Sequence, residues 1–198
     1  MIKILGIIAS QLTERLYRHC PLDPSKKAIY EYGIQLSLST LASMCSIILL
    51  GILFGNPASA FLFLGVFFFL RLFSGGYHAP TYTRCFLLTN VVYLVVYALS
   101  QEIIHFRFFF LLPMIVVASC VTIIVLAPIR NRNHPLSEMT YAKNRKNAMV
   151  LSLLESLTLV FLFLWEGFRP YITVPVLSLA AVAVMMLFTL RRKEEYGK

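Results

Sequence analysis

The sequence predicts an all-α polytopic membrane protein with about six transmembrane helices and an N-terminal amphipathic helix. Hydrophobic residues make up 59% of the 198-residue chain, against about 45–50% in a soluble domain. They are concentrated in runs of about 20 residues, the length at which a helix crosses the roughly 30 Å hydrocarbon core of a bilayer. The chain is therefore expected to form one integral membrane domain over residues 1–198.

The first 20 residues have the pattern of an amphipathic helix lying in the membrane interface. Apolar residues recur at three- and four-residue steps, and basic residues lie among them. An ordinary helix packed against the rest of the protein fits the same pattern. Two prolines in "PLDPSKK" (21–27) then interrupt it. No cleavable signal peptide is expected, because no small-residue cleavage site follows an apolar core. The apolar positions are Ile4, Leu5, Ile8, Leu12 and Leu16, and the basic ones are Lys3, Arg15 and Arg18.

Six apolar runs between residues 34 and 190 are the candidate spans of the six-helix bundle. Short turns connect several of them: "GNP" (55–57), His105 to Arg107, and "EGFRP" (166–170). Residues 129–148 are expected to form a basic loop, and residues 191–198 a basic cytoplasmic tail. The spans are expected at about 34–54, 57–73, 85–104, 108–128, 149–167 and 171–190.

The distribution of basic residues predicts the orientation. If the N-terminus lies in the cytoplasm, only Arg107 and Arg169 among the 18 lysines and arginines lie outside. Cytoplasmic loops collect Lys and Arg, so both termini are expected in the cytoplasm. The net charge of +9 is then explained by topology, and no nucleic-acid partner is expected.

One polar stretch between two spans, "SGGYHAPTYTRC" (74–85), carries candidate catalytic groups. An imidazole (His78) beside a thiol (Cys85) is the arrangement of a cysteine nucleophile with a general base. In one straight helix the two groups would be about 10 Å apart along the axis, too far for proton transfer. Gly75, Gly76 and Pro80 are residues that break a helix, so the backbone can fold His78 back toward Cys85.

Other roles for this stretch stay open. Asn90, Thr81 and Glu138 are candidates for a third group that orients His78. Metal binding is less favoured, because a closed site takes about four ligands and the four cysteines show no CxxC spacing. No metal or other cofactor is expected.

Two ionisable residues lie inside the apolar runs, where charges are costly. Arg71 is near the end of the second run, and Glu155 lies in the fifth. Arg71 either extends toward the lipid headgroups or faces inward. In the second case we expect it to pair with Glu155 and to help position the substrate.

Two classes of protein other than an enzyme fit the same hydropathy. In a small transporter or permease component for a peptide, residues 74–85 would form a re-entrant gate, since irregular backbone is tolerated where it lines a cavity. The sequence lacks the repeated halves that many transporters show. A noncatalytic membrane scaffold is the other alternative.

The stretch "RLFSGGYHAPTYTRC" (71–85) resembles the accessory gene regulator B (AgrB) family. Members carry an Arg, a Gly-Gly-x-His element, and a Cys seven residues after the His. Arg71, Gly75, Gly76, His78 and Cys85 match in order. Chain length, the basic N-terminal arm and the apolar segments also agree. "APIRNRNHPLS" (127–137) is similar to the family's basic loop, although Arg130 and Arg132 stand where members often have a lysine-rich run.

The resemblance implies a membrane endopeptidase in quorum sensing. Such enzymes remove the C-terminal part of a small AgrD-type propeptide and help convert it into a cyclic thiolactone or lactone signal. It further implies that Cys85 is the nucleophile, that His78 is the general base, and that the protein forms a homodimer. Basic cytoplasmic loops would attract an acidic propeptide tail.

Overall fold

The computed structural model describes residues 2–19, 23, 25, 27–75, 81–129 and 137–195, which form helices joined by short connections and contain no strand. This confirms the predicted fold class. The seven α-helices are α1 (Ile2–His19), α2 (Lys27–Leu53), α3 (Pro57–Ser74), α4 (Tyr82–His105), α5 (Leu111–Leu126), α6 (Glu138–Phe163) and α7 (Arg169–Glu195), with a short 3₁₀ helix η2 (Glu166–Phe168) before α7.

Five segments of the described chain are long and apolar enough to cross a membrane: α2, α3, α4, α6, and Glu166–Arg191, which joins η2 to α7. Helix α5 is equally apolar but has only 16 residues, a length of about 24 Å. It ends early because Pro128 follows Ala127, which is extended (φ −76°, ψ 145°), as residues before proline prefer.

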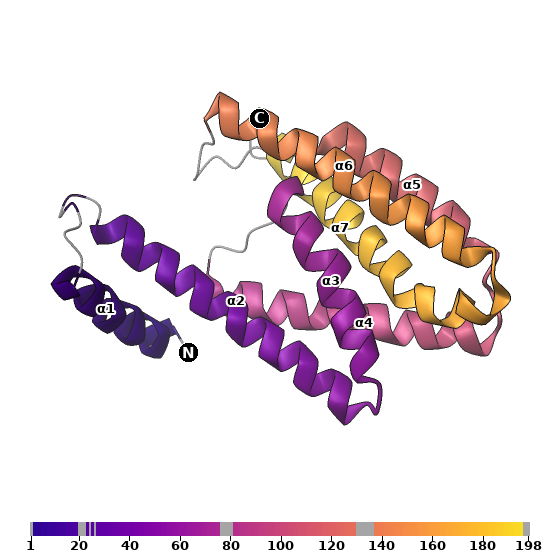
Figure 1. Ribbon diagram of the computed structural model, residues 1–198, viewed down its shortest axis with the longest axis horizontal. Helices are drawn as coiled ribbons and strands as arrows, with labels where there is room; N and C mark the ends of the chain where they lie inside the picture. Colours follow the sequence, from indigo (N-terminus) through magenta and orange to yellow (C-terminus); the bar gives the residue numbers. More distant parts are fainter. Residues whose placement is uncertain are drawn as a thin grey trace.

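The helices run back and forth between two ends of the molecule (Figure 1). The connections 54–56, 106–110 and 164–168 lie toward the lower right of Figure 1, at what we call the turn end. The last residues of α3 and α5 and the first residues of α4 lie at the other end, which we call the Cys85 end. This alternation agrees with the predicted order of spans and turns.

Helix α7 forms the centre of the bundle. It packs against α3, α4, α5 and α6, and Figure 1 shows it between α3 and the α5–α6 pair. Over residues 172–179 its whole circumference is buried, which identifies a segment enclosed on all sides, and farther along only one face is buried. The buried residues include Thr173, Val176, Ser178, Leu179 and Met186.

Helices α2, α3 and α4 pack closely at the turn end because small residues meet there. A Cβ atom on Gly51 would lie 2.7 Å from Cβ of Ala60 and 3.2 Å from the hydroxyl of Tyr93. That hydroxyl shares a 2.8 Å hydrogen bond with Ser59. Close approach of helices through small residues is typical of membrane bundles.

Several helices extend beyond the predicted spans. Helix α6 begins at Glu138 rather than near residue 149, so half of the expected 129–148 loop is helical. Helix α2 begins seven residues early at Lys27, and α7 continues to Glu195 through the start of the expected tail. The reason is that hydropathy reports which residues contact lipid, whereas a polar segment continues a helix into water when its residues favour helix formation.

The predicted N-terminal helix is present as α1 and packs against α2. Ala9 and Thr13 are buried in this contact, and the rings of Tyr17 and Tyr30 meet edge to face with centroids 6.1 Å apart. Ile8, Leu12 and Leu16 remain exposed on α1. The helix thus combines a packed face with an exposed apolar face, and its location in the membrane interface stays a prediction.

Candidate active site

Cys85 lies in the first turn of α4. The hydroxyl of Thr81 caps the helix by accepting from the amide of Arg84 (3.3 Å), and the amide of Cys85 donates to the carbonyl of Thr81 (3.0 Å). Helix α4 begins at Tyr82, because Thr81 supplies the side-chain cap. The half-buried thiol therefore lies at a helix N-terminus, the end that carries partial positive charge.

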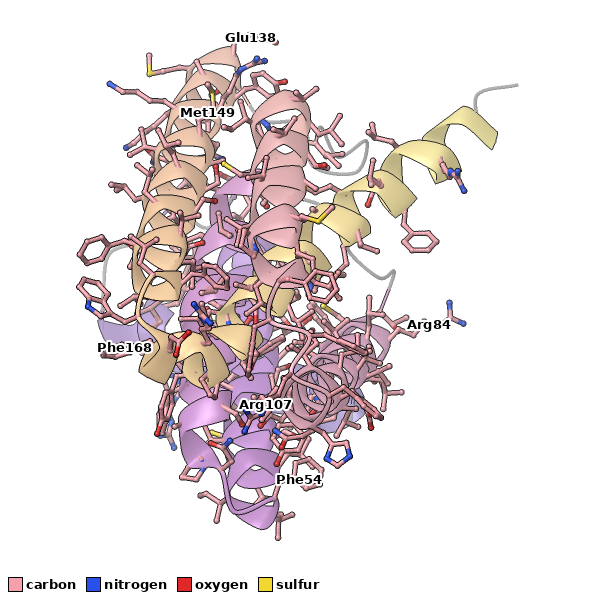
Figure 2. All side chains as sticks on the ribbon, turned by 90° about the vertical axis from the view of Figure 1, so that its right-hand side faces the viewer. Phe54, Arg84, Arg107, Glu138, Met149 and Phe168 are labelled. Atoms are coloured by element: carbon pink, nitrogen blue, oxygen red, sulfur yellow. The ribbon has the colours of Figure 1, made fainter. Side chains whose placement is uncertain are left out.

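Arg71 is the charged group that the structure places beside this thiol. It lies in the last turn of α3, and its Nη2 is 4.0 Å from Sγ of Cys85. Its guanidinium also lies 5.5 Å from the ring centroid of Phe67, which holds its position. Arg84 is adjacent to Cys85 in sequence but points outward from the bundle (Figure 2). Negative charge on the sulfur is thus attracted by Arg71 from the neighbouring helix.

Hydrogen bonds of residues that follow Cys85 along the helix stabilise the first turns of α4. The hydroxyl of Thr89 donates to the carbonyl of Cys85 (2.9 Å). Asn90 donates to the carbonyl of Phe86 (2.8 Å) and accepts from the hydroxyl of Ser46 on α2 (2.7 Å). The buried Asn90 therefore ties α4 to α2, and Thr81 caps α4. That one of them also orients His78, which lies outside the described residues, stays a prediction. No sequence pattern singled out Ser46 or Thr89.

Gly75 joins the end of α3 to the segment that follows α5. Its φ is +69°, a conformation that favours glycine. A Cβ atom there would lie 3.1 Å from the carbonyl oxygen of Ile129, and the Ile129 amide donates to the carbonyl of Ser74 (3.0 Å). The predicted special conformation at Gly75 is confirmed. The close approach to Ile129 brings the beginning of the basic loop to the candidate site.

Five predicted site residues lie outside the described residues: Gly76, His78 and Pro80 in one segment, and Arg130 and Arg132 in the other. The described residues that flank these segments are Gly75, Thr81, Ile129 and Ser137. Since Ile129 is hydrogen-bonded to Ser74, the described residues that precede the two segments lie side by side at the Cys85 end.

The structure does not bring Arg71 and Glu155 together, so the expected ion pair is wrong. Glu155 lines a separate cavity with Leu62 and Val66 of α3, and its Oε2 atom has no hydrogen-bond partner among the described residues. Leu62 and Val66 lie about 13 and 7 Å before Arg71 along the helix. Arg71 faces inward as expected, but toward Cys85 and at a different depth from Glu155.

The described residues hold no group of three or more His, Cys, Asp or Glu side chains that would bind a metal ion. Cys45, Cys85 and Cys120 are free thiols. Their surroundings differ: Cys45 is exposed on α2, Cys120 is buried, and Cys85 alone among the three contacts a cationic side chain.

The fold and this site define a multi-pass helical membrane protein with a thiol and an arginine together at one end of the bundle. The family model "Accessory gene regulator B" matches residues 9–190, nearly the whole chain. The protein belongs to the AgrB family. Membership places it in accessory gene regulator quorum sensing and implies an AgrD-type propeptide as substrate.

Two relatives from Clostridium perfringens support this assignment. "Putative AgrB-like protein 2" of strain 13 / Type A is 25% identical over 162 residues, which cover 79% of this chain and 73% of the relative. "Putative AgrB-like protein" of strain SM101 / Type A is 24% identical with the same coverage. No solved structure matches this chain significantly.

Proposed function

We propose that the protein is a membrane cysteine endopeptidase that cleaves an AgrD-type propeptide and promotes its cyclisation. The contact of Cys85 with Arg71 at the start of α4 is the observation that carries this proposal. Reactive cysteines are partly exposed and lie beside cationic groups or at helix N-termini, whereas inert cysteines are buried in apolar surroundings. The half-buried Cys85 thiol, beside Arg71 and in the first turn of α4, has the surroundings of a nucleophile.

The proposed reaction has two acyl-transfer steps. His78 takes the proton of Cys85, the thiolate attacks a peptide carbonyl, and the C–N bond breaks as His78 returns the proton to the leaving amine. The propeptide is then held as a thioester on Cys85. Its own Cys or Ser attacks the thioester carbonyl, which closes a thiolactone or lactone ring and restores the Cys85 thiol. Proximity favours this intramolecular attack over hydrolysis.

Chain connectivity supports the pairing of His78 with Cys85. His78 is three residues from Gly75 and three from Thr81, and both flanking residues lie at the Cys85 end. Arg71 would stabilise negative charge on the sulfur and on the carbonyl oxygen as it develops. Arg130 and Arg132 follow Ile129, which is bonded to Ser74, so they are suited to attract an acidic propeptide tail.

The remaining features follow from the family and from the distribution of charge. We propose that the protein acts in the bacterial cytoplasmic membrane, with both termini and the Cys85 end in the cytoplasm, and that it forms a homodimer. A site at the membrane surface walled by helices restricts water, which protects a thioester from hydrolysis.

Co-expression with a tagged propeptide tests the enzyme against a peptide transporter. Cys85→Ser and His78→Ala should each lower cleavage by at least about 100-fold, because each removes a reacting group. Cys45→Ser, a matched change of an exposed thiol on α2, should retain cleavage within about twofold. The measurement is the ratio of cleaved to full-length propeptide on immunoblots.

Retained cleavage in both Cys85→Ser and His78→Ala would contradict the proposal and favour the transporter or the scaffold. A hydroxylamine-sensitive adduct of the propeptide on Cys85 would identify the thioester directly.

A further inference from the structure

A partly enclosed cavity of about 630 Å³ lies between α3, α6 and the start of α7. Its volume is within the range of about 300–1,000 Å³ typical of small-molecule sites. The walls are almost entirely apolar side chains, among them Leu62, Val66, Leu159, Phe168, Tyr171 and Ile172.

Glu155 is the one acidic residue that lines this cavity. Its Oε2 atom is buried and has no hydrogen-bond partner among the described residues. Thr158 also lines the cavity, but its hydroxyl donates to the carbonyl of Leu154 (2.8 Å). A buried carboxyl oxygen without a donor costs several kcal/mol in apolar surroundings. Intramembrane acidic residues of this kind mark functional sites by default.

The cavity is separate from the candidate active site and lies within the apolar part of the bundle. Glu155 is eight residues before the end of α6 at Phe163, about 12 Å from the turn end. Cys85 lies at the opposite end, where α3 finishes. Because apolar walls surround Glu155 at this depth, molecules dissolved in the hydrocarbon of the bilayer are the natural source of an occupant.

We propose that this cavity binds a membrane-dissolved amphiphile whose apolar body fills the walls and whose amine or alcohol head donates a hydrogen bond to Glu155. An alkyl chain alone leaves Oε2 unsatisfied, and a head that only accepts hydrogen bonds cannot satisfy an ionised carboxylate, which has no proton to donate. A donor satisfies it, and a cationic amine adds attraction to the carboxylate. The site is independent of the proposed peptidase chemistry, since neither Cys85 nor Arg71 lines the cavity.

Trp165 provides the signal for a test. It is the single tryptophan of the chain, it contacts Phe161 with ring centroids 4.5 Å apart, and it lies three residues before the cavity residue Phe168. Bromine quenches tryptophan fluorescence at short range. Purified full-length protein in lipid nanodiscs is titrated with 12-bromododecylamine, 12-bromododecanol and the methyl ether of 12-bromododecanol, which has no donor.

The amine and the alcohol should quench Trp165 saturably, with affinities at least about tenfold above that of the ether. Glu155→Gln should lower the affinity for the amine at least about tenfold, and Glu155→Leu should make the three affinities equal. Thr158→Val changes a lining hydroxyl that is already bonded, so it should preserve the wild-type order. Size-exclusion profiles confirm that each variant is folded.

Equal affinities for all three compounds in the wild type would overturn the proposal, because the cavity would then accept any alkyl chain. Selectivity that survives in Glu155→Leu would also overturn it. Cys85→Ser should bind the amine as the wild type does. Failure of the peptidase proposal therefore leaves the binding result unaffected. Failure of amine binding likewise leaves the peptidase proposal unaffected.

Discussion

Gly75 allows the end of α3 to lie against Ile129, the residue that begins the basic loop. Its positive φ turns the chain out of α3, and the missing side chain leaves room for the carbonyl oxygen of Ile129. Gly55 has nearly the same φ, +70°, but open space around it. Both positions therefore share the cost of a positive φ, and Gly75 alone adds a close contact.

Alanine at Gly75 should destabilise the protein more than alanine at Gly55. A positive φ is unfavourable for a residue with a Cβ atom, and this cost applies at both positions. At Gly75 the new Cβ also meets Ile129, whose backbone is held by the bond to Ser74, so at least about 1 kcal/mol more is expected. Unfolding in mixed micelles titrated with SDS measures the difference. Equal losses would show that the Ile129 contact is unimportant.

Single residues also show where sequence reasoning succeeded and where it failed. Arg71 and Cys85 were predicted as site residues from their types and spacing, and the structure brings their side chains together. The pairing of Arg71 with Glu155 was wrong, because an apolar run gives the depth of a residue only roughly and does not say which neighbour its side chain faces. His78 stays a prediction.

Helix α6 illustrates how a helix continues beyond the lipid-facing segment. Its first eleven residues include charged and amide side chains, yet they are helical from Glu138 onward. Ser137 begins the helix by accepting from the amide of Thr140 (3.3 Å). The cap marks the start of the helix, whereas the apolar run begins about ten residues later.

Ser137→Ala should loosen the polar first turns of α6 without affecting the apolar part. Loss of a serine cap costs about 0.5–2 kcal/mol, and this segment has little packing to compensate. Hydrogen exchange of residues 138–146 should accelerate several-fold. Ser37→Ala, at an exposed position inside α2 where the hydroxyl donates to the carbonyl of Gly33, should leave exchange unchanged. No acceleration in Ser137→Ala would mean that the cap is dispensable.

The bundle as a whole is organised around α7. Two leucines of this helix differ in burial: Leu179 is fully buried and Leu187 is 47% exposed. Replacing each by alanine is therefore expected to change stability by different amounts. In a bilayer an exposed leucine exchanges protein surroundings for equally apolar lipid, so stability depends on packing rather than on removal from water.

Leu179→Ala should therefore destabilise the bundle by about 2–5 kcal/mol through the cavity it leaves. Leu187→Ala should cost less than about 1 kcal/mol. Parallel SDS titrations of the two variants provide the measurement. Similar losses at both positions would contradict the central position of α7.

The orientation in the membrane can be tested with single cysteines. In a background with Cys20, Cys45, Cys85 and Cys120 replaced by serine, Arg107→Cys should react with a membrane-impermeant maleimide in intact cells. Lys143→Cys should react only after lysis, because α6 begins at the opposite end from Arg107 (Figure 2). Labelling of Lys143→Cys in intact cells would reverse the predicted orientation.

The sequence by itself determined the helical membrane fold, the order of the spans and the residue types of the candidate site. Run length and the period of apolar residues are local properties, so they can be read along the chain. Only the tertiary structure decided that α7 is central, that Arg71 contacts Cys85 rather than Glu155, and that Ile129 lies against Gly75. These facts depend on which faces of different helices meet, and lipid-facing and buried positions are equally apolar, so hydropathy does not distinguish them.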